Sequence, residues 1–169
     1  RLNYELVERQ RTEGAFRESE AFRQRVFESS RMPIVIMESE NLTYIDCNPA
    51  AVQIYGFATR EKTLGKTPLD VSAPFQSDGT PSDEKVRFYI RQAQVEGGVV
   101  FEWRHQRPNQ EVWDAEVHLM SFFSGERQYL QFTLQDITQR KQAERQVFQT
   151  ANQLTVLNEI GRAVSEVTD

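Results

Sequence analysis

Three successive runs of alternating apolar and polar residues, in the second half of the chain, constrain the fold more than any other feature. The runs are VVFEWRH, EVWDAEVHLMSFF and YLQFTLQD, and the last ends at Asp136. An alternation with period two indicates strands that bury one face. The segments RPNQ and SGER between the runs are typical of turns. The sequence therefore predicts three consecutive strands joined by short turns.

Two strand-like runs and three helical segments precede this region. PIVIME and LTYID are short β-type runs separated by the turn residues SEN, a pattern that predicts a hairpin. In NPAAVQIYGF, Asn48 is expected to cap a helix that Gly56 ends. The sequence then predicts a short helix over 59–65, a helical turn near Leu69 and a longer helix over 83–96, capped by Ser82 or Asp83, with Val86, Ile90 and Ala93 on its inner face.

This order of elements predicts an α+β fold. Two leading and three trailing strands can form one five-stranded antiparallel sheet, with the helices on one face. We expect this domain to occupy residues 29–138. The flanking segments, 1–28 and 139–169, are expected to be helices.

The flanking helices carry few apolar residues. One thin apolar face is too small to hold an isolated helix in water, so each helix needs a partner. We therefore expect a homodimer that forms through these helices. In the C-terminal segment the apolar and small residues follow an imperfect heptad spacing, at Ala143, Val147, Thr150, Leu154, Leu157, Gly161 and Val164.

Charge and composition exclude several classes of function. The formal net charge is −5, which argues against a nucleic-acid partner because phosphate binding needs a basic face. No apolar run approaches the roughly 20 residues that a membrane helix requires, so we expect no membrane insertion by this segment. The single cysteine, Cys47, cannot form an internal disulfide, which favours a reducing, cytoplasmic location. Because the sequence starts with Arg1, we expect a fragment of a longer protein.

The sequence contains no recognisable catalytic or metal-binding pattern. Both histidines, His105 and His118, fall in strand-like segments, where we expect structural or surface roles. A phosphate-binding Gly-rich loop and a Cys/His metal spacing are both absent from the sequence. We therefore expect neither catalytic residues nor a metal site.

The junction between the last strand and the C-terminal helix, QDITQR, contains neither Gly nor Pro. Asp136 is expected to cap the helix, with Gln139 completing a capping box. Ile137 is expected to anchor the turn in the apolar layer, ahead of Thr138. The strand and the helix would then move as one body, so residues 136–138 are the predicted junction for transmitting a signal.

Four motifs in this order resemble the PAS sensor family: FRESEAFRQRVFESS, YIDCNPAAVQIYGF, FEWRHQRPNQEVW and QDITQR. The resemblance covers roughly Glu20 to Arg145, although Asn109-Gln110 replaces the family's usual Asp-Gly turn. It implies a sensory or relay module of a bacterial multi-domain signalling protein, of the sensor histidine kinase type. Such modules dimerise through flanking helices and act on an output domain of the same chain. The final stretch, LTVLNEIGRAVSEVTD, is similar to the first helix of a GAF domain.

The resemblance raises the question of a cofactor. The reactive-cysteine motif of light-oxygen-voltage domains has no match, and the long helix, DEKVRFYIRQAQVE, lacks the axial histidine of PAS-type haem sensors. Non-covalent flavin or a small organic ligand remain open. The alternatives are a ligand-free dimerisation and relay module with a filled core, or the input module of a diguanylate cyclase. The residues expected to line a ligand cavity are Tyr55, Tyr89, Ile90, Phe101 and Trp103.

Overall fold

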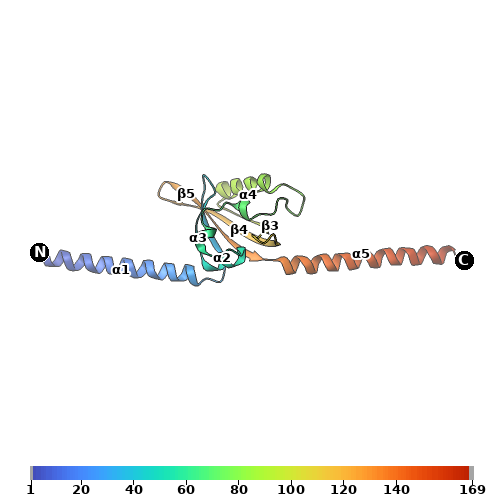
Figure 1. Ribbon diagram of the computed structural model, residues 1–169, viewed down its shortest axis with the longest axis horizontal. Coiled ribbons are helices and arrows are strands. Elements are labelled where there is room, and N and C mark those ends of the chain that lie inside the picture. Colours follow the sequence, from blue (N-terminus) through green and yellow to red (C-terminus); the bar gives the residue numbers. More distant parts are fainter. Residues whose placement is uncertain (1, 168–169) are drawn as a thin grey trace.

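The computed structural model describes residues 2–167, which form a sheet domain with one long helix at each end (Figure 1). The two end helices project from the domain in opposite directions. The elements are α1 (Leu2–Ser29), β1 (Ile34–Glu38), β2 (Tyr44–Cys47), α2 (Pro49–Tyr55), α3 (Arg60–Thr63), the 3₁₀ helix η1 (Pro68–Val71), α4 (Ser82–Glu96), β3 (Gly98–Gln106), β4 (Val112–Ser124), β5 (Arg127–Asp136) and α5 (Thr138–Val167).

The predicted α+β fold is confirmed. All five strands form one antiparallel sheet in the order β2-β1-β5-β4-β3, and α2, α3 and α4 cover one of its faces. The strand that leads into α5 is therefore the central one, because β5 pairs with β1 on one side and with β4 on the other. Both neighbours of the strand that carries the outgoing helix are hydrogen-bonded to it.

The core lies between the sheet and the covering helices, and its residues follow the predicted alternation. The inward residues of β4 and the stripe on α4 are all buried, as expected: Trp113, Ala115, Val117, Leu119, Val86, Ile90 and Ala93. On β5 the inward residues are Leu130, Phe132 and Leu134. A sheet with only one covered face buries every second residue of each strand, which accounts for the period of two.

Asn48 caps α2 as predicted and also joins it to its neighbours. The buried Asn48 side chain accepts hydrogen bonds from the N–H groups of Ala51, at 3.1 Å, and Ile34, at 2.9 Å. Its amide nitrogen donates to the carbonyl oxygens of Met32, at 2.8 Å, and Phe27, at 3.2 Å. This side chain therefore fixes the end of α1 against the start of β1.

The predicted cap of α4 is wrong. The helix begins at Ser82, directly after Pro81, and no side chain caps it. The Ser82 hydroxyl donates instead to the carbonyl of Ala73 and accepts from Nε2 of Gln76 at 2.7 Å. Long-range bonds to the preceding loop have taken the place of the local cap that the sequence suggested.

The turn between β3 and β4 contains a residue in the left-handed region. Gln110 has φ of 70°, and its N–H donates to the carbonyl of Arg107 at 2.9 Å. This position follows the turn proper and favours glycine, because a Cβ in the left-handed conformation crowds the next carbonyl. The Asn-Gln pair therefore adopts the hairpin geometry with some backbone strain.

Candidate functional site

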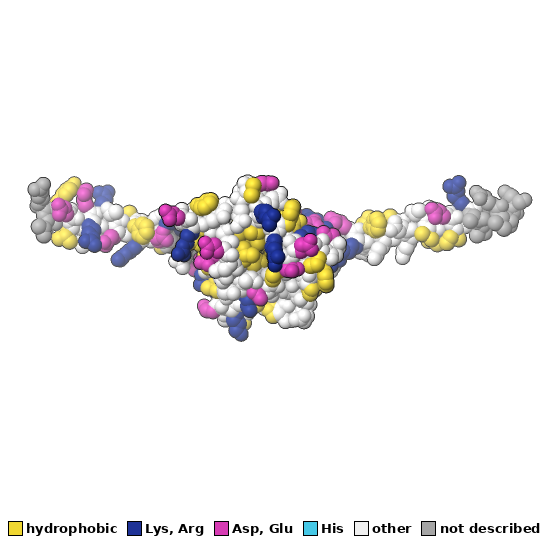
Figure 2. All heavy atoms as spheres, turned by 90° about the horizontal axis from the view of Figure 1, so that it is seen from above, with side chains coloured by type: hydrophobic (Ala, Val, Ile, Leu, Met, Phe, Trp, Pro, Cys, Tyr) yellow, Lys and Arg dark blue, Asp and Glu magenta, His cyan; other side chains and the backbone are white. Residues whose placement is uncertain are grey.

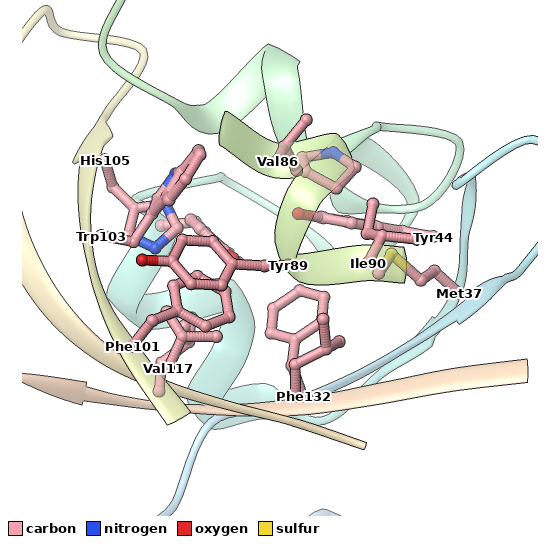
Figure 3. Close-up of a pocket in the computed structure, with 14 residues that line it drawn as sticks. Met37, Tyr44, Val86, Tyr89, Ile90, Phe101, Trp103, His105, Val117 and Phe132 are labelled. Atoms are coloured by element: carbon pink, nitrogen blue, oxygen red, sulfur yellow. The ribbon is translucent and has the colours of Figure 1, made fainter. Parts of the chain in front are cut away.

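All five residues that the sequence suggested for a ligand cavity line one cavity between the helices and the inner face of the sheet. The cavity has a volume of about 40 Å³. In Figure 3, His105, Trp103 and Phe101 lie along one side, and Tyr44 and Met37 lie at the opposite side. The lining residues include Met37, Tyr44, Tyr55, Val86, Tyr89, Ile90, Phe101, Trp103, His105, Val117, Phe132 and Leu134.

Aromatic rings occupy much of the space beside this cavity. The ring of Tyr89 is stacked on that of Phe101, with centroids 3.7 Å apart and planes within 4°. Trp103 meets both rings edge-on, and its indole N–H donates to Oγ of Ser72 at 2.7 Å. Tyr89 and Phe101 are only half-buried, so this stack separates the cavity from solvent.

Among the lining residues that the sequence analysis did not predict, His105 is the one whose titratable side chain has a buried polar atom without a partner among residues 2–167. Its Nδ1 lies 3.1 Å from the carbonyl oxygen of Val71, which can only accept, so Nδ1 carries the proton. Burial lowers the pKa of His105 to about 4, so the ring is neutral at physiological pH. The missed signal was the alternation along β3, which places Phe101, Trp103 and His105 on the same face.

Two polar atoms at this cavity lack partners within the described part of the chain. They are Nε2 of His105 and the hydroxyl of Tyr55, and both are fully buried. Burial raises the pKa of the Tyr55 phenol well above its usual value, and the hydroxyl of Tyr44 beside it raises this pKa further, so the Tyr55 hydroxyl keeps its proton. A third such atom, Nε1 of Trp113, does not line the cavity. Buried polar groups are rarely left unpaired, so these two atoms call for an explanation.

At the other end of the inner face, β5 passes directly into α5. The Ile137 N–H donates to the carbonyl of Asp114 at 2.9 Å, and Oγ1 of Thr138 accepts from the N–H of Asp114 at 3.0 Å. The Ile137 side chain is buried, with 3% of its surface exposed. The Thr138 hydroxyl also donates to the carbonyl of Asp114 at 3.4 Å, so three hydrogen bonds and one apolar anchor attach the first residues of the outgoing helix to β4.

The cap at this junction differs from the predicted one. The helix begins at Thr138, and the carbonyl of Ile137 accepts the first helical hydrogen bond, from Lys141. Asp136 is thus one residue too early to be the N-cap, although its Oδ1 accepts from the N–H of Thr138 at 2.9 Å. Within residues 2–167 Gln139 forms no reciprocal side-chain bond, so the capping box is also wrong.

Arg107 connects the cavity wall with this junction. Its guanidinium lies over the ring of Trp113, 5.1 Å from the centroid, and its Nε donates to the carbonyl of Ile54 at 2.9 Å. Its Nη2 lies 3.9 Å from a carboxylate oxygen of Asp136. The ring of Trp113 is in turn stacked on that of His105, with centroids 4.6 Å apart. A continuous line of contacts therefore runs from the cavity to the start of α5.

Ion pairs also attach the first two turns of α5 to the sheet. Arg140 approaches Glu102 at 3.3 Å and Glu116 at 3.7 Å, and Lys141 pairs with Glu102 as well. Arg145 lies 3.3 Å from Asp114. These partners belong to β3 and β4, so the outgoing helix rests on the strands that form one wall of the cavity.

A family model described as the PAS fold matches residues 27–142, which is more than half of the chain. The chain belongs to the PAS family. No curated protein matches it. Its PAS domain is itself non-catalytic, and among residues 2–167 no helix has both the length and the hydropathy that a membrane crossing requires.

Solved structures of other PAS domains have the same fold. The PAS domain of an HTR-like protein from Haloarcula marismortui is 20% identical, with a TM-score of 0.62 over 76% of this chain and 99% of that one. A PAS domain from a two-component sensor histidine kinase is 12% identical, with a TM-score of 0.59 over 71% and 97%. An RNA-binding light-oxygen-voltage receptor is 21% identical, with a TM-score of 0.63 over 79% and 37%.

The cofactors known from PAS sensors do not fit this cavity. Binding sites for drug-sized ligands and cofactors have volumes of roughly 300–1,000 Å³, far above the volume available here. Cys47, the only cysteine, does not line the cavity, and α4 contains no histidine. The lining therefore suits neither a flavin nor a haem.

Proposed function

We propose that this PAS domain is a sensory module of a bacterial signal-transduction protein, and that it converts a change in its cavity into a movement of α5. The observation that carries the proposal is the double role of β5. Its residues Phe132 and Leu134 line the cavity, and the strand continues within three residues into α5. Because the junction is bonded to β4 and lacks Gly and Pro, little flexibility separates the cavity from the helix.

A substitution on the cavity side of β5 tests this role. Phe132→Leu replaces a buried aromatic ring with a smaller aliphatic side chain. We expect this change to raise hydrogen exchange in the first turn of α5, residues 138–141. Phe123→Leu is the matched control, because Phe123 belongs to the same sheet but is exposed and does not line the cavity. Equal exchange in the two variants and in the wild type would contradict the proposal.

We assign the output to a further domain of the same chain, of the histidine kinase type. The support is the motif resemblance together with the like fold of the sensor histidine kinase domain. In this proposal residues 29–138 are the sensor, and residues 1–28 and 139–169 are connecting helices in the cytoplasm. The GAF-like stretch LTVLNEIGRAVSEVTD lies in the second connection, of which Thr168 and Asp169 fall outside the described residues.

The proposed active form is a homodimer that pairs through these helices. Figure 2 shows apolar side chains along both projecting helices, where the domain cannot cover them. On α5, Val147 and Leu154 are seven residues apart, and Leu157 follows Leu154 by three residues, which is the spacing of the two apolar positions within a heptad. The predicted positions Gly161 and Val164 lie outside the described side chains. Among the side chains that the structure describes, the exposed large apolar residues on the two helices are Tyr4, Leu6, Val7, Phe16, Phe22, Val26, Val147, Phe148, Leu154, Val156, Leu157 and Ile160.

Light scattering on the 169-residue chain tests the dimer. We expect a dimer at micromolar concentrations, and we expect the double variant Phe16→Ser/Phe22→Ser to shift the equilibrium toward the monomer. Phe88→Ser is the control, because Phe88 is equally exposed but lies on α4. A monomeric wild type, or an equal loss in the control, would refute pairing through α1.

A second candidate function is relay without a ligand. The small cavity and the stacked Tyr89 and Phe101 rings favour it, because a nearly filled core leaves little room for a small molecule. Native mass spectrometry of the purified chain, with an absorption spectrum, separates the two. A bound mass that disappears on denaturation supports sensing of a ligand. The mass of the bare chain alone supports relay.

A further inference from the structure

The cavity is apolar apart from a few polar atoms in its wall. None of its lining residues carries a charge at neutral pH, since His105 is neutral there. A charged ligand would lose its hydration without gaining a partner, which is costly in an apolar site. The ligand chemistry that this wall accepts is therefore uncharged.

The hydrogen-bonding direction at the wall is also defined. Because Nδ1 of His105 donates to the Val71 carbonyl, Nε2 presents a lone pair and can only accept. The Tyr55 hydroxyl lies beside that of Tyr44, which interacts with it, and it can donate or accept. An occupant that donates to Nε2 would give this buried acceptor the partner that it lacks among the described residues.

The remaining wall favours an aromatic ring. Phe101, Trp103 and His105 are successive inward residues of β3, so their side chains lie in a row along one wall. An aromatic ligand that lies against Phe101 and Trp103 would direct a polar substituent toward His105.

A movement of the Tyr89 side chain would make space for such a ring in the cavity. Its ring already covers Phe101, it is half-buried, and its hydroxyl has no hydrogen-bond partner within residues 2–167. A cavity of about 150 Å³ suffices for benzene. Outward rotation of Tyr89 would add the space of one aromatic ring to the present cavity.

We propose that the cavity binds a small uncharged aromatic molecule that donates a hydrogen bond to Nε2 of His105, with its ring taking the place of Tyr89 on Phe101. This inference rests on the proposed sensory function and names its ligand class. The selecting group is His105, since a site with a buried unpaired acceptor rejects an isostere that lacks the donor.

Phenol and toluene are the probes that test it, because they differ only by a hydroxyl in place of a methyl group. In nuclear magnetic resonance titrations of the 169-residue chain, we expect the Kd of phenol to be about tenfold lower than that of toluene, which corresponds to 1.4 kcal/mol. In His105→Phe, which keeps an aromatic ring beside Trp113, the order should reverse. Tyr55→Phe should reduce the preference for phenol without reversing it.

The outcomes separate this inference from the proposed function. If toluene binds as tightly as phenol in the wild type, the ligand class is refuted, even if His105→Phe fails to fold. If neither probe shifts the amide signals of cavity residues at millimolar concentrations, the inference is refuted. If phenol is preferred but the amides of Ile137 and Thr138 do not respond, the ligand class stands and the sensory relay fails. If those amides respond to both probes equally, the relay stands and the selection by His105 fails.

Discussion

Replacement of Thr138 by valine tests how the outgoing helix is attached to the sheet. Thr138 is the first residue of α5, and its Oγ1 accepts the hydrogen bond of the Asp114 N–H at 3.0 Å. Valine keeps the β-branched shape of threonine but removes the acceptor. The N–H of Asp114, on a residue that is only 9% exposed, then loses its partner.

The expected cost follows from that lost partner. A buried donor left unpaired costs about 1–3 kcal/mol. Since a domain of this kind is typically stable by about 5–15 kcal/mol, Thr138→Val should remain folded. The loss should also be local, because the apolar anchor Ile137 and the bond from its N–H to Asp114 remain in place.

Two measurements check this expectation, with Thr138→Ser as the control that keeps the hydroxyl. Chemical denaturation should show a loss of about 1–3 kcal/mol for the valine variant and a much smaller loss for the serine variant. Hydrogen exchange at the Asp114 amide should rise about tenfold for each 1.4 kcal/mol of lost local stability. The reasoning is refuted if Thr138→Val changes neither quantity, or if serine and valine are equally destabilising.

Three further substitutions and one pH dependence have defined expectations. Ile137→Ala should cost about 2–5 kcal/mol in the free energy of unfolding because Ile137 is buried, whereas Asp136→Ala should cost only about 1 kcal/mol because the carboxylate is half-exposed. For His105, burial lowers the pKa to about 4, below the value of about 6.5 in an unfolded chain. The unfolded state therefore binds more protons between these values, so the stability is complete above pH ~6.5 and decreases by up to about 3 kcal/mol as the pH falls toward 4. Gln110→Gly should stabilise the chain by up to about 1 kcal/mol, because Gln110 has a positive φ.

Each of these expectations has a contrary result in the same denaturation experiments. Equal losses for Ile137→Ala and Asp136→Ala would show that the apolar anchor is not the stronger attachment. An unchanged acid dependence in His105→Phe would remove His105 as its cause. A loss of stability in Gln110→Gly would show that the turn is not strained.

The sequence allowed the sheet, its buried faces and the cavity wall to be predicted, because each depends on local periodicity. Tyr89 and Ile90 fall on the inner side of a helix, and Phe101 and Trp103 on the inner face of a strand, whatever the rest of the fold. Asn48 was recognisable as a cap because its bond to Ala51 spans only three residues.

The parts that were missed depend on pairing between distant segments. The surface alternative for His105 is wrong and its place at the cavity was not predicted, because its bond to Val71 spans 34 residues, although the alternation along β3 already puts it on the inner face. The attachment of Thr138 to Asp114 spans 24 residues, and Arg107 reaches Ile54 across 53. The cap at Ser82 failed for the same reason, since its hydroxyl bonds to a loop instead of to its own helix.

The central claim is that a change at the cavity reaches the start of α5 through the sheet, and amide chemical shifts test it most directly. Tyr89→Ala changes the cavity from the side of α4, on the opposite wall from β5, and Phe88→Ala is its exposed neighbour on the same helix. In ¹H–¹⁵N spectra we expect Tyr89→Ala, but not Phe88→Ala, to shift the amides of Asp114, Ile137 and Thr138. Shifts that remain confined to α4 and its immediate neighbours on β3 in both variants would contradict the claim.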